Sequence, residues 1–496
     1  MPLTHTASAL QAISFRDPVG RVILAGERCL RVMTAPAGLL LEEFLATEVG
    51  QRGIEDGKLI ATHAVDSISD ALLTELAETN WGEPLKPKVF EHETVAFANY
   101  PYEWPAEMFE SAAHLTLDLA SNVIPSGFNL KDGSPWNVMF RGTEPVFLDL
   151  ASFERRNPLD RLWLPYGQFT RTFLLPLLIW RAMRVPPGQH FRISRDGLKP
   201  ADCFRRLGLT RALLPPALEI CTVPAVFAWW ARRWKKTTAD LRPARARSAE
   251  EAQFVVSRLL RRLERTLDRV GMREPVTSEW TQYEDEVAER EFASGYFETK
   301  RQFVAEVLTL TQPKSCLDLG CNTGRFSLMA VEAGARVVAV DRDPASVGSL
   351  YLKARAERRN LLPLVQDIAR PAPAMGWNNS ESFAFLDRAV QARFEMVMVL
   401  ALVHHLCLVE RVPLVEVTRL LARLAARWLV VEFVPREDPL ARRMPDAWIG
   451  GSDWSRYDQK VFEETFARYF RIARRTELAG SGRWIYLMEV HPRTIA

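Results

Sequence analysis

Residues 316–327 read CLDLGCNTGRFS, and this stretch decides the fold of the half of the chain that contains it. A short apolar run leads directly into a loop with two glycines, Gly320 and Gly324, and a carboxylate, Asp318, lies inside the run. Glycines at such a turn let the backbone adopt positive φ and approach a ligand closely. The stretch therefore predicts a strand, a ligand-binding loop and a helix in succession, the first turn of a doubly wound α/β sheet.

The spacing of the two glycines limits the class of ligand. They form G-x-x-x-G, whereas dinucleotide sites use G-x-G-x-x-G, and Cys321 stands where a further glycine would make room for a pyrophosphate. No Lys-Ser or Lys-Thr pair follows to form a phosphate loop. The loop therefore favours an uncharged or cationic ligand over a polyphosphate.

From about residue 279 onward, short apolar runs alternate with helix-like segments. The runs are CLDLG, RVVAVD, LLPLVQD, FEMVMVLA, WLVVEFV and IYLMEV. They are almost continuously apolar, as strands are when helices cover both faces of their sheet. The alternation predicts a parallel α/β sheet with helices on both faces.

Carboxylates end two of these predicted strands. Asp341 ends the second run, where a carboxylate can accept both hydroxyls of a ribose. The third run ends in Gln366, Asp367 and Ile368, where a carboxylate can bind an exocyclic amine. Because the carboxyl ends of parallel strands meet at one edge of a sheet, these residues predict a single site.

These motifs resemble those of the class I S-adenosylmethionine-dependent methyltransferases: CLDLGCNTG looks like the first motif, VVAVDRD the second and VQDI the third. The one departure is Asn322, where the family most often has glycine, and asparagine tolerates positive φ better than most residues. The resemblance covers residues 279–496 and implies a Rossmann-like, seven-stranded methyltransferase sheet without a metal. It also implies that S-adenosylmethionine is the cofactor and that its contacts are Asp318, Gly320, Cys321, Asn322, Gly324, Asp341, Arg342, Asp367, Ile368, Leu400, Tyr296 and Lys300.

The segments FEMVMVLALVHHL and WLVVEFVPREDP resemble the fourth and fifth strands of that fold, which face the acceptor. His404 and His405 are candidate general bases because an imidazole takes up protons near neutral pH. His405 is favoured, and the alternative is that one histidine packs against the next helix. Glu432 and Asp438 are the alternative bases.

Residues 279–303 are predicted to form a lid helix over the donor. Tyr283, Tyr296 and Lys300 would then reach the donor carboxylate or the acceptor. The alternative is an exposed helix with aromatic residues in the core. Domain boundaries are expected near the segment GMREPVTS at 271–278.

The N-terminal half has its own cluster of polar residues. The stretch FNLKDGSPWNVMFRGTEPVFLDLASFE contains Asp132, Asn137 and Asp149. Their spacing resembles the catalytic and metal loops of the protein-kinase-like aminoglycoside phosphotransferases, in which an Asp orients the acceptor and an Asn and a second Asp bind Mg²⁺. The resemblance implies an α+β kinase-like module with a small β-rich lobe at 1–105, including one helix near 37–49, and a helical lobe at 106–270.

Other positions of this half depart from that pattern. Arg31 stands where the family has its phosphate-pairing Lys, with Glu42 or Glu43 as its expected partner, and Leu130 stands where the family has His. No glycine-rich phosphate loop precedes them. The module is therefore expected to be degenerate, and the alternative for the sequence D-G-S-P is a simple turn.

The phrases YEWPAEMF, LKDGSPWNV, FLDLASFE and VVEFVP give the whole chain a resemblance to bacterial proteins related to a rhizobial host-specificity nodulation protein. We expect a methyltransferase for a small-molecule, glycan or carrier-bound natural-product acceptor, with the N-terminal module recruiting that acceptor. Two alternatives stay open: a bifunctional methyltransferase and phosphotransferase, and a non-catalytic scaffold that binds S-adenosylmethionine. The acceptor atom and the oligomeric state are not predicted.

Composition limits the partners and the compartment. The 64 basic and 61 acidic residues give a net charge of +3, which gives no reason to expect nucleic acid as a partner. Six scattered cysteines without a CxxC pair favour a reducing compartment, and with no recognisable signal peptide we expect a cytoplasmic protein. The apolar stretches 173–180 and 213–231 are interrupted or too short to span a bilayer. They are predicted to be buried helices, with an interfacial membrane helix as the alternative.

Overall fold

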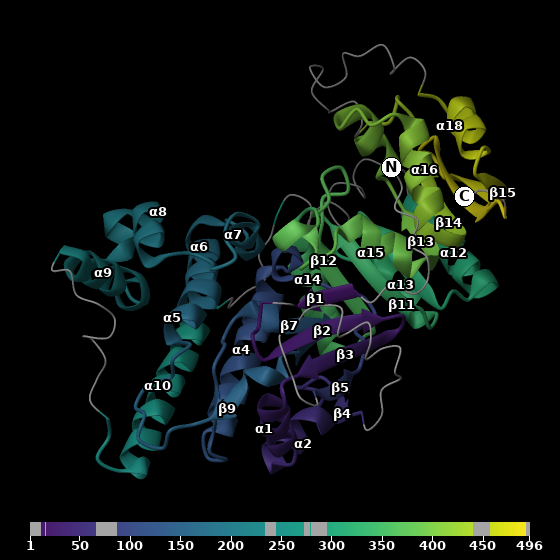
Figure 1. The fold of residues 1–496 in the computed structure, drawn as a ribbon. Helices are drawn as coiled ribbons and strands as arrows, with labels where there is room; N and C mark the ends of the chain where they lie inside the picture. The colour runs from purple at the N-terminus through teal and green to yellow at the C-terminus, as the bar shows by residue number, and fades with distance from the viewer. Residues whose placement is uncertain are drawn as a thin grey trace.

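The chain has a mixed α/β architecture, described by the computed structural model for residues 11–14, 16–65, 87–233, 245–271, 278, 295–439 and 457–492. Each half of the chain has one large sheet, and in Figure 1 both lie on the side of the molecule away from α8 and α9, with β15 at its edge. The helices α8 and α9 lie at one end of the molecule, and α18 lies at the other. The described chain is therefore elongated around two neighbouring sheets.

The N-terminal sheet is antiparallel, with the strand order β1-β2-β3-β5-β4. Its strands are β1 (Gln11–Ser14), β2 (Gly20–Ala25), β3 (Arg28–Met33), β4 (Thr62–Ala64) and β5 (Lys88–His92). Two helices, α1 (Ala35–Leu45) and α2 (Glu48–Glu55), lie between β3 and β4 in the chain. The helix predicted near 37–49 is present as α1, but it ends at Leu45. A second helix that was not predicted, α2, follows it, and the Thr47 hydroxyl caps α2 by accepting a hydrogen bond from the Gly50 N–H at 3.0 Å.

The middle of the chain is mostly helical, with short strands at 128–155. The long helix α4 (Ala106–Val123) precedes the antiparallel pairs β6 (Phe128–Leu130) with β9 (Phe153–Arg155), and β7 (Val138–Arg141) with β8 (Glu144–Phe147). Three short helical turns are η1 (Pro101–Glu103), η2 (Pro135–Asn137) and η3 (Leu150–Ser152). The later helices are α5 (Tyr166–Phe169), η4 (Thr170–Leu174), α6 (Leu175–Met183), α7 (Pro187–Ile193), α8 (Pro200–Ala212), η5 (Leu218–Thr222), α9 (Val223–Arg233) and α10 (Ala249–Val270).

The C-terminal sheet has seven strands in the order β12-β11-β10-β13-β14-β16-β15. They are β10 (Ser315–Leu319), β11 (Arg336–Asp341), β12 (Leu361–Val365), β13 (Phe394–Val399), β14 (Ala425–Phe433), β15 (Phe470–Leu478) and β16 (Arg483–Val490). The first five are parallel, as predicted, whereas β16 runs antiparallel to both of its neighbours. Strand β15 was not predicted, because its side chains are mostly exposed and polar and it lacks the apolar run of a buried strand.

Alternate residues of the central strands enter different cores. Val337 and Ala339 of β11 pack in a core with residues of α12 and α13, and Val338 and Val340 pack in a second core on the opposite face. That second core is continuous with the core of the N-terminal half. The helices of this half are α12 (Tyr296–Thr311), α13 (Arg325–Glu332), α14 (Pro344–Ala356), η8 (Trp377–Asn379), α15 (Phe385–Ala392), η9 (His405–Val409), α16 (Leu414–Leu424) and α18 (Gln459–Phe466).

A buried polar network joins the two halves. Glu103 of η1 forms an ion pair with Arg388 of α15, and its Oε1 also accepts a hydrogen bond from the Gln366 Nε2 at 2.6 Å. The Arg388 guanidinium lies 4.9–5.6 Å from the ring centres of Phe97, Tyr100 and Phe385. Glu103 is fully buried, so its charge depends on Arg388 for compensation.

Both edges of the seven-stranded sheet have unusual features. The edge strand β12 contains Pro363, and the turn at Gly142 of the N-terminal half lies against the Leu361 backbone at the start of β12. The other edge strand, β15, exposes Arg471, Arg474 and Arg475. Its pairing with β16 shifts register between residues 472 and 474.

The two long apolar stretches differ in burial. Residues 173–180 are buried in η4 and α6, as predicted. The prediction that 213–231 is buried was wrong for most of α9, where Trp229 is 67% exposed. Within this segment η5 packs against α8, and among the described residues α9 contacts mainly η5 and α8, so many of its side chains stay exposed. Within the part of the chain that the structure describes, no helix combines the length and the hydropathy needed to cross a bilayer.

Glu107 of α4 is a buried carboxylate that lies against Gly348 of α14. Burial raises its pKa to about 7, with Glu110 raising it further and Arg184 lowering it. Because the unfolded pKa is lower, the folded state loses stability as the pH rises from about 4.5 through 7. We expect Glu107→Gln to be more stable than the wild type at pH 8 by on the order of 2–3 kcal/mol.

Urea unfolding at pH 5, 6, 7 and 8 measures this effect. The advantage of Glu107→Gln should shrink steadily toward pH 5, since the wild-type carboxyl is then protonated in the folded state. An equal difference in the free energy of unfolding at all four pH values would contradict the assignment to Glu107.

Candidate functional site

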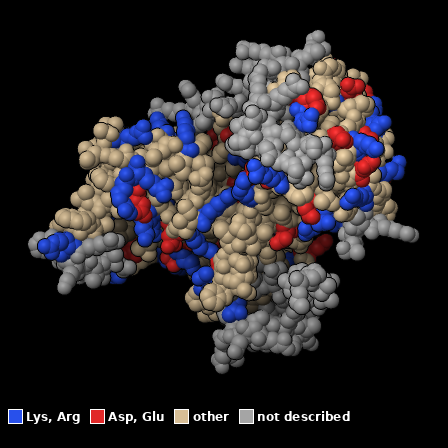
Figure 2. Space-filling model, turned by 90° about the horizontal axis from the view of Figure 1, so that it is seen from above, with Lys and Arg blue, Asp and Glu red and all other residues tan. Residues whose placement is uncertain are grey.

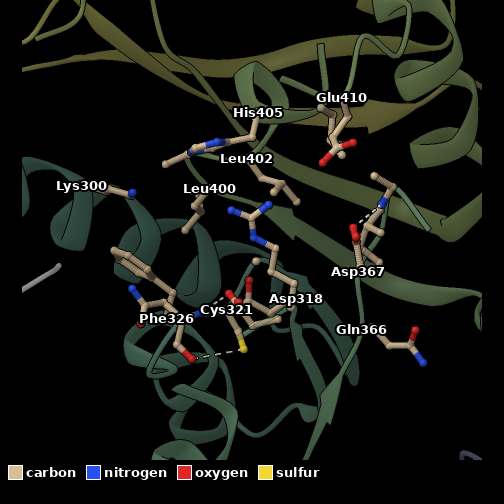
Figure 3. Close-up of a pocket in the computed structure, with 18 of the residues that line it drawn as sticks. Lys300, Asp318, Cys321, Phe326, Gln366, Asp367, Leu400, Leu402, His405 and Glu410 are labelled. Carbon is tan, nitrogen blue, oxygen red and sulfur yellow. Dashed lines mark hydrogen bonds between the residues drawn. The ribbon is translucent and has the colours of Figure 1, made fainter. Parts of the chain in front are cut away.

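A cavity opens at the carboxyl ends of β10, β11, β12 and β13. Figure 3 shows side chains of the loops after these strands arranged around it, with Lys300 approaching from α12. The residues that line the cavity are Tyr296, Phe297, Lys300, Asp318, Gly320, Cys321, Asn322, Phe326, Asp341, Arg342, Gln366, Asp367, Ile368, Ala369, Leu400, Ala401, Leu402, His405, Leu406, Glu410 and Arg483. The cavity therefore lies at the edge of the sheet where α/β folds bind ligands.

The loop after β10 turns sharply through positive φ. Gly320, Asn322 and Gly324 have φ values of 78°, 50° and 82°. A Cβ atom on Gly324 would lie 2.3 Å from the Leu350 Cδ1, so this position excludes larger residues. Gly324 begins α13 and does not line the cavity, whereas Gly320 and Asn322 do.

Asp341 ties this loop to the end of β11. Its Oδ2 accepts a hydrogen bond from the Asn322 N–H at 2.9 Å, and its Oδ1 accepts one from the Asp343 N–H at 2.9 Å. Burial raises the pKa of Asp341, and the two N–H donors partly oppose that rise. A carboxylate has about four acceptor sites, so two hydrogen bonds leave capacity for a ligand.

Three more carboxylates line the cavity with Asp341. Asp318 is buried and accepts a hydrogen bond from the Ser327 hydroxyl at 2.6 Å. Asp367 and Glu410 both pair with the exposed Arg370. Lys300, Arg342 and Arg483 also line the cavity, so the four carboxylates act as separate acceptors for hydroxyl and amine donors of a ligand.

A buried polar network lies beside the cavity, between α12 and the strands β14 and β16. The Lys300 ammonium lies 2.7 Å from the Glu432 Oε2, and the Tyr296 hydroxyl donates to the Glu432 Oε1 at 2.9 Å. Arg483 donates to the Tyr296 hydroxyl at 2.9 Å and to the Asp438 Oδ2 at 2.7 Å. Burial alone would raise the pKa of Glu432, but Lys300, Arg483 and Tyr296 hold that pKa below its usual value.

The two histidines occupy different environments after β13. His405 lines the cavity, whereas His404 is buried behind it, with the ring centres 4.2 Å apart. Burial lowers the pKa of His405 to about 4, and Arg342 and Arg483 lower it further. Burial also lowers the pKa of His404 well below its usual value. Both imidazoles are therefore neutral at pH 7.

Most of the predicted cofactor contacts come together in this cavity. Gly324, His404, Glu432 and Asp438 do not line it: Gly324 begins a helix, and the other three lie in its buried surroundings. Tyr283 lies outside the described residues.

Several lining residues were not predicted, among them Phe297, Phe326, Leu402, Glu410 and Arg483. Phe326 lies within the quoted motif, so its position after Gly324 was an available signal. Arg483 reaches the site because β16 pairs with β14, a contact without a local sequence signal.

The polar residues of the N-terminal half form a separate cluster. Arg31 pairs with the Asp149 Oδ1 at 2.8 Å and donates to the His92 Nε2 at 3.1 Å. Burial raises the pKa of Asp149, but Arg31 outweighs this together with Ser152 and Lys131, so the pKa is lowered overall. Burial raises the pKa of Asp132, and Asn137 opposes that rise.

The expected pairing of Arg31 with Glu42 or Glu43 was wrong. The Glu42 carboxylate lies 2.6 Å from the Lys88 ammonium, and Glu43 pairs with Arg155. Lys88 packs its side chain close to Gly38 of α1, which brings its ammonium to this helix, while Arg31 turns toward Asp149. Arg31 therefore forms its ion pair with Asp149 and not with either glutamate of α1.

Comparisons with known proteins give one relative along nearly the whole chain. No protein-family model matches the chain. The chain is similar to the nodulation protein NoeA of Rhizobium meliloti (strain 1021), with 29% identity over 480 residues, 96% of this chain and 95% of that protein. The similarity therefore includes both halves.

Three similar solved structures each match less than half of this chain. Magnesium protoporphyrin IX methyltransferase (ChlM) from Synechocystis PCC 6803 with bound SAH is 20% identical, with a TM-score of 0.30 over 42% of this chain and 88% of that chain. N-methyltransferase NodS from Bradyrhizobium japonicum WM9 is 16% identical, with a TM-score of 0.29 over 40% and 98%. A SAM dependent methyltransferase from Aquifex aeolicus is 15% identical, with a TM-score of 0.28 over 42% and 97%.

Proposed function

We propose that the cavity at the carboxyl ends of β10–β13 binds S-adenosylmethionine and that the protein transfers its methyl group to an acceptor. The observation that carries this proposal is the set of four carboxylates that line one cavity beside a loop with G-x-x-x-G spacing. These carboxylates suit a ligand with free hydroxyls and amino groups, and the G-x-x-x-G loop lacks the glycine spacing of dinucleotide sites.

The residues present fit that donor. Asp341 keeps acceptor capacity for two ribose hydroxyls after binding the Asn322 and Asp343 N–H groups. Asp367 would accept from the exocyclic amine, and Ile368 and Leu400 offer apolar contacts to a flat base. Asp318 supplies negative charge for the amino group of the donor.

When bound, the donor supplies an electrophilic methyl group on a sulfonium. The protein's part is then to hold the acceptor atom in line with that group and to exclude water. His405 is the imidazole that lines the cavity, and on this position we propose that it takes the proton from an acceptor that must lose one. Its pKa of about 4 makes it a weaker base than a free imidazole. Glu432 and His404 are proposed to hold Lys300 and His405 in place, since neither lines the cavity.

For the acceptor we propose a small molecule, a glycan or a carrier-bound natural product, recruited by the N-terminal module. We also propose the three-part division at 1–105, 106–270 and 279–496, with a kinase-like arrangement for the first two parts. The strand order β1-β2-β3-β5-β4, followed by the cluster of Asp132, Asn137 and Asp149, supports that arrangement. The Arg31–Asp149 ion pair weighs against phosphate transfer, because Asp149 would have to bind Mg²⁺ instead.

Isothermal titration of the full-length protein with S-adenosylmethionine tests the donor site. We expect Asp341→Ala to weaken binding by at least about 100-fold, since two charge-assisted hydrogen bonds to a ligand together contribute about 3 kcal/mol or more. Asp387→Ala, which removes an exposed carboxylate outside the cavity, should leave the affinity unchanged.

Two results would count against the proposal. If the wild-type protein binds no S-adenosylmethionine, the proposal has no basis. If the wild type and Asp341→Ala bind it equally well, the donor site lies elsewhere. A parallel titration with ATP and Mg²⁺ tests the alternative of a bifunctional methyltransferase and phosphotransferase. That alternative requires ATP binding that is lost when Asp149 is replaced.

A further inference from the structure

The helix α9 exposes several large apolar side chains on one face. Val226, Phe227, Trp229 and Trp230 are 57%, 49%, 67% and 41% exposed. Helices of this length draw most of their stability from packing of an apolar face. The described part of the chain therefore leaves α9 without the cover that its composition calls for.

The apolar surface continues onto the end of α8. Leu209, Leu213 and Leu214 are 69%, 52% and 62% exposed. The Thr222 hydroxyl donates to the Ala212 carbonyl at 2.6 Å, which fixes the start of α9 against the end of α8. These side chains and those of α9, including Val223, make up one region, here named the α8–α9 surface.

Basic residues accompany this surface. Arg205, Arg206, Arg211 and Arg233 are exposed on α8 and α9. The sequence from 199 to 236 contains eight Lys or Arg residues against two acidic ones, and both acidic residues pair with arginines. Figure 2 shows Lys and Arg side chains set among uncharged ones over this end of the molecule.

We propose that the α8–α9 surface docks on a membrane surface that contains anionic lipids. Tryptophan prefers the boundary between headgroups and acyl chains, and exposed arginines attract anionic headgroups. A helix of eleven residues is too short to span, so the contact would be interfacial. This interaction goes beyond the proposed methyl transfer and does not depend on it.

The positive charge of the α8–α9 surface favours an anionic membrane over a second copy of the chain as its binding partner. A two-fold contact would place the same surface against itself and so bring arginines of like sign together. Like charges placed against each other in an interface cost several kcal/mol. An anionic bilayer instead meets apolar side chains with acyl chains and arginines with phosphates.

Co-sedimentation of the full-length protein with extruded vesicles tests the proposal. We expect binding to vesicles of phosphatidylcholine mixed with phosphatidylglycerol, weaker binding to phosphatidylcholine alone, and loss of the difference at high salt. Phe227→Ser combined with Trp229→Ser should reduce partitioning about tenfold or more, because both rings would leave the interface. Arg205→Gln with Arg206→Gln should reduce binding only to the anionic vesicles.

A matched control comes from the other half of the chain. Trp377 is 69% exposed, so Trp377→Ser removes an equally accessible indole away from the α8–α9 surface and should leave partitioning unchanged. Circular dichroism checks that each variant is folded. The proposal is overturned if the wild-type protein partitions onto neither kind of vesicle. It is also overturned if the Phe227→Ser, Trp229→Ser protein partitions as strongly as the wild type. A dimer dispersed by those substitutions would also overturn it, since the surface would then bind a second copy.

Discussion

Replacing Glu432 with alanine is expected to lower the free energy of unfolding by about 3–5 kcal/mol, the cost of removing one partner from a buried ion pair. Glu432 is fully buried, and its Oε2 lies 2.7 Å from the Lys300 ammonium. Its loss would leave Lys300 buried beside two aromatic rings and would weaken the hold on Arg483. Urea unfolding followed by circular dichroism measures the change.

Two comparisons isolate the effect of burial. Glu489→Ala removes a carboxylate from the neighbouring strand β16, where it pairs with arginines at the surface, so a much smaller loss is expected. The double variant Lys300→Met, Glu432→Leu should recover much of the stability, because no buried charge is left alone. A Glu432→Ala protein as stable as Glu489→Ala would show that the buried pair is not important for stability.

Glu103→Ala is expected to lower the free energy of unfolding by a similar amount, about 3–5 kcal/mol, at the contact between the two halves. Arg388 would lose its carboxylate partner, and Gln366 would lose an acceptor at 2.6 Å. The aromatic rings around Arg388 compensate only in part, because a cation over a ring contributes about 2 kcal/mol even when desolvated. Thermal and urea unfolding of the full-length protein measure the loss.

The matched control is Glu48→Ala, which removes an exposed partner of Arg52 on α2 and should change stability little. The double variant Glu103→Leu, Arg388→Met tests whether the cost arises from the unpaired charge. If this double variant is no more stable than Glu103→Ala, shape rather than charge determines the contact between the halves.

The strands of the C-terminal sheet were predictable because a strand that is buried on both faces of its sheet appears in the sequence as a continuous apolar run. The runs ending at Leu319, Asp341 and Val365 are apolar at successive positions, and the structure places strands there. The proximity of the polar residues that directly follow these strands was also predictable, because parallel strands bring their carboxyl ends to one edge of the sheet.

Other features depend on contacts between distant segments, which leave no local pattern. Arg483 enters the cavity because an antiparallel strand returns beside β14, and Arg388 reaches Glu103 across 285 residues of sequence. The exposure of α9 was mispredicted for a related reason. The sequence pattern of an apolar helix is the same whether the folded protein buries the helix or exposes it to solvent. Its environment is decided by neighbours and not by its own composition.

The two edges of the seven-stranded sheet bear on how the protein behaves at high concentration. An open edge offers unpaired N–H and C=O groups to strands of other molecules. At β12, Pro363 removes one such donor, and the Gly142 turn lies against the strand's first residues. At β15, Arg471, Arg474 and Arg475 place exposed charged side chains, each paired with a carboxylate, along the strand, and the register shift interrupts its regular pairing. Both edges thus resist strand-to-strand aggregation, one by lost hydrogen bonding and the other by charge.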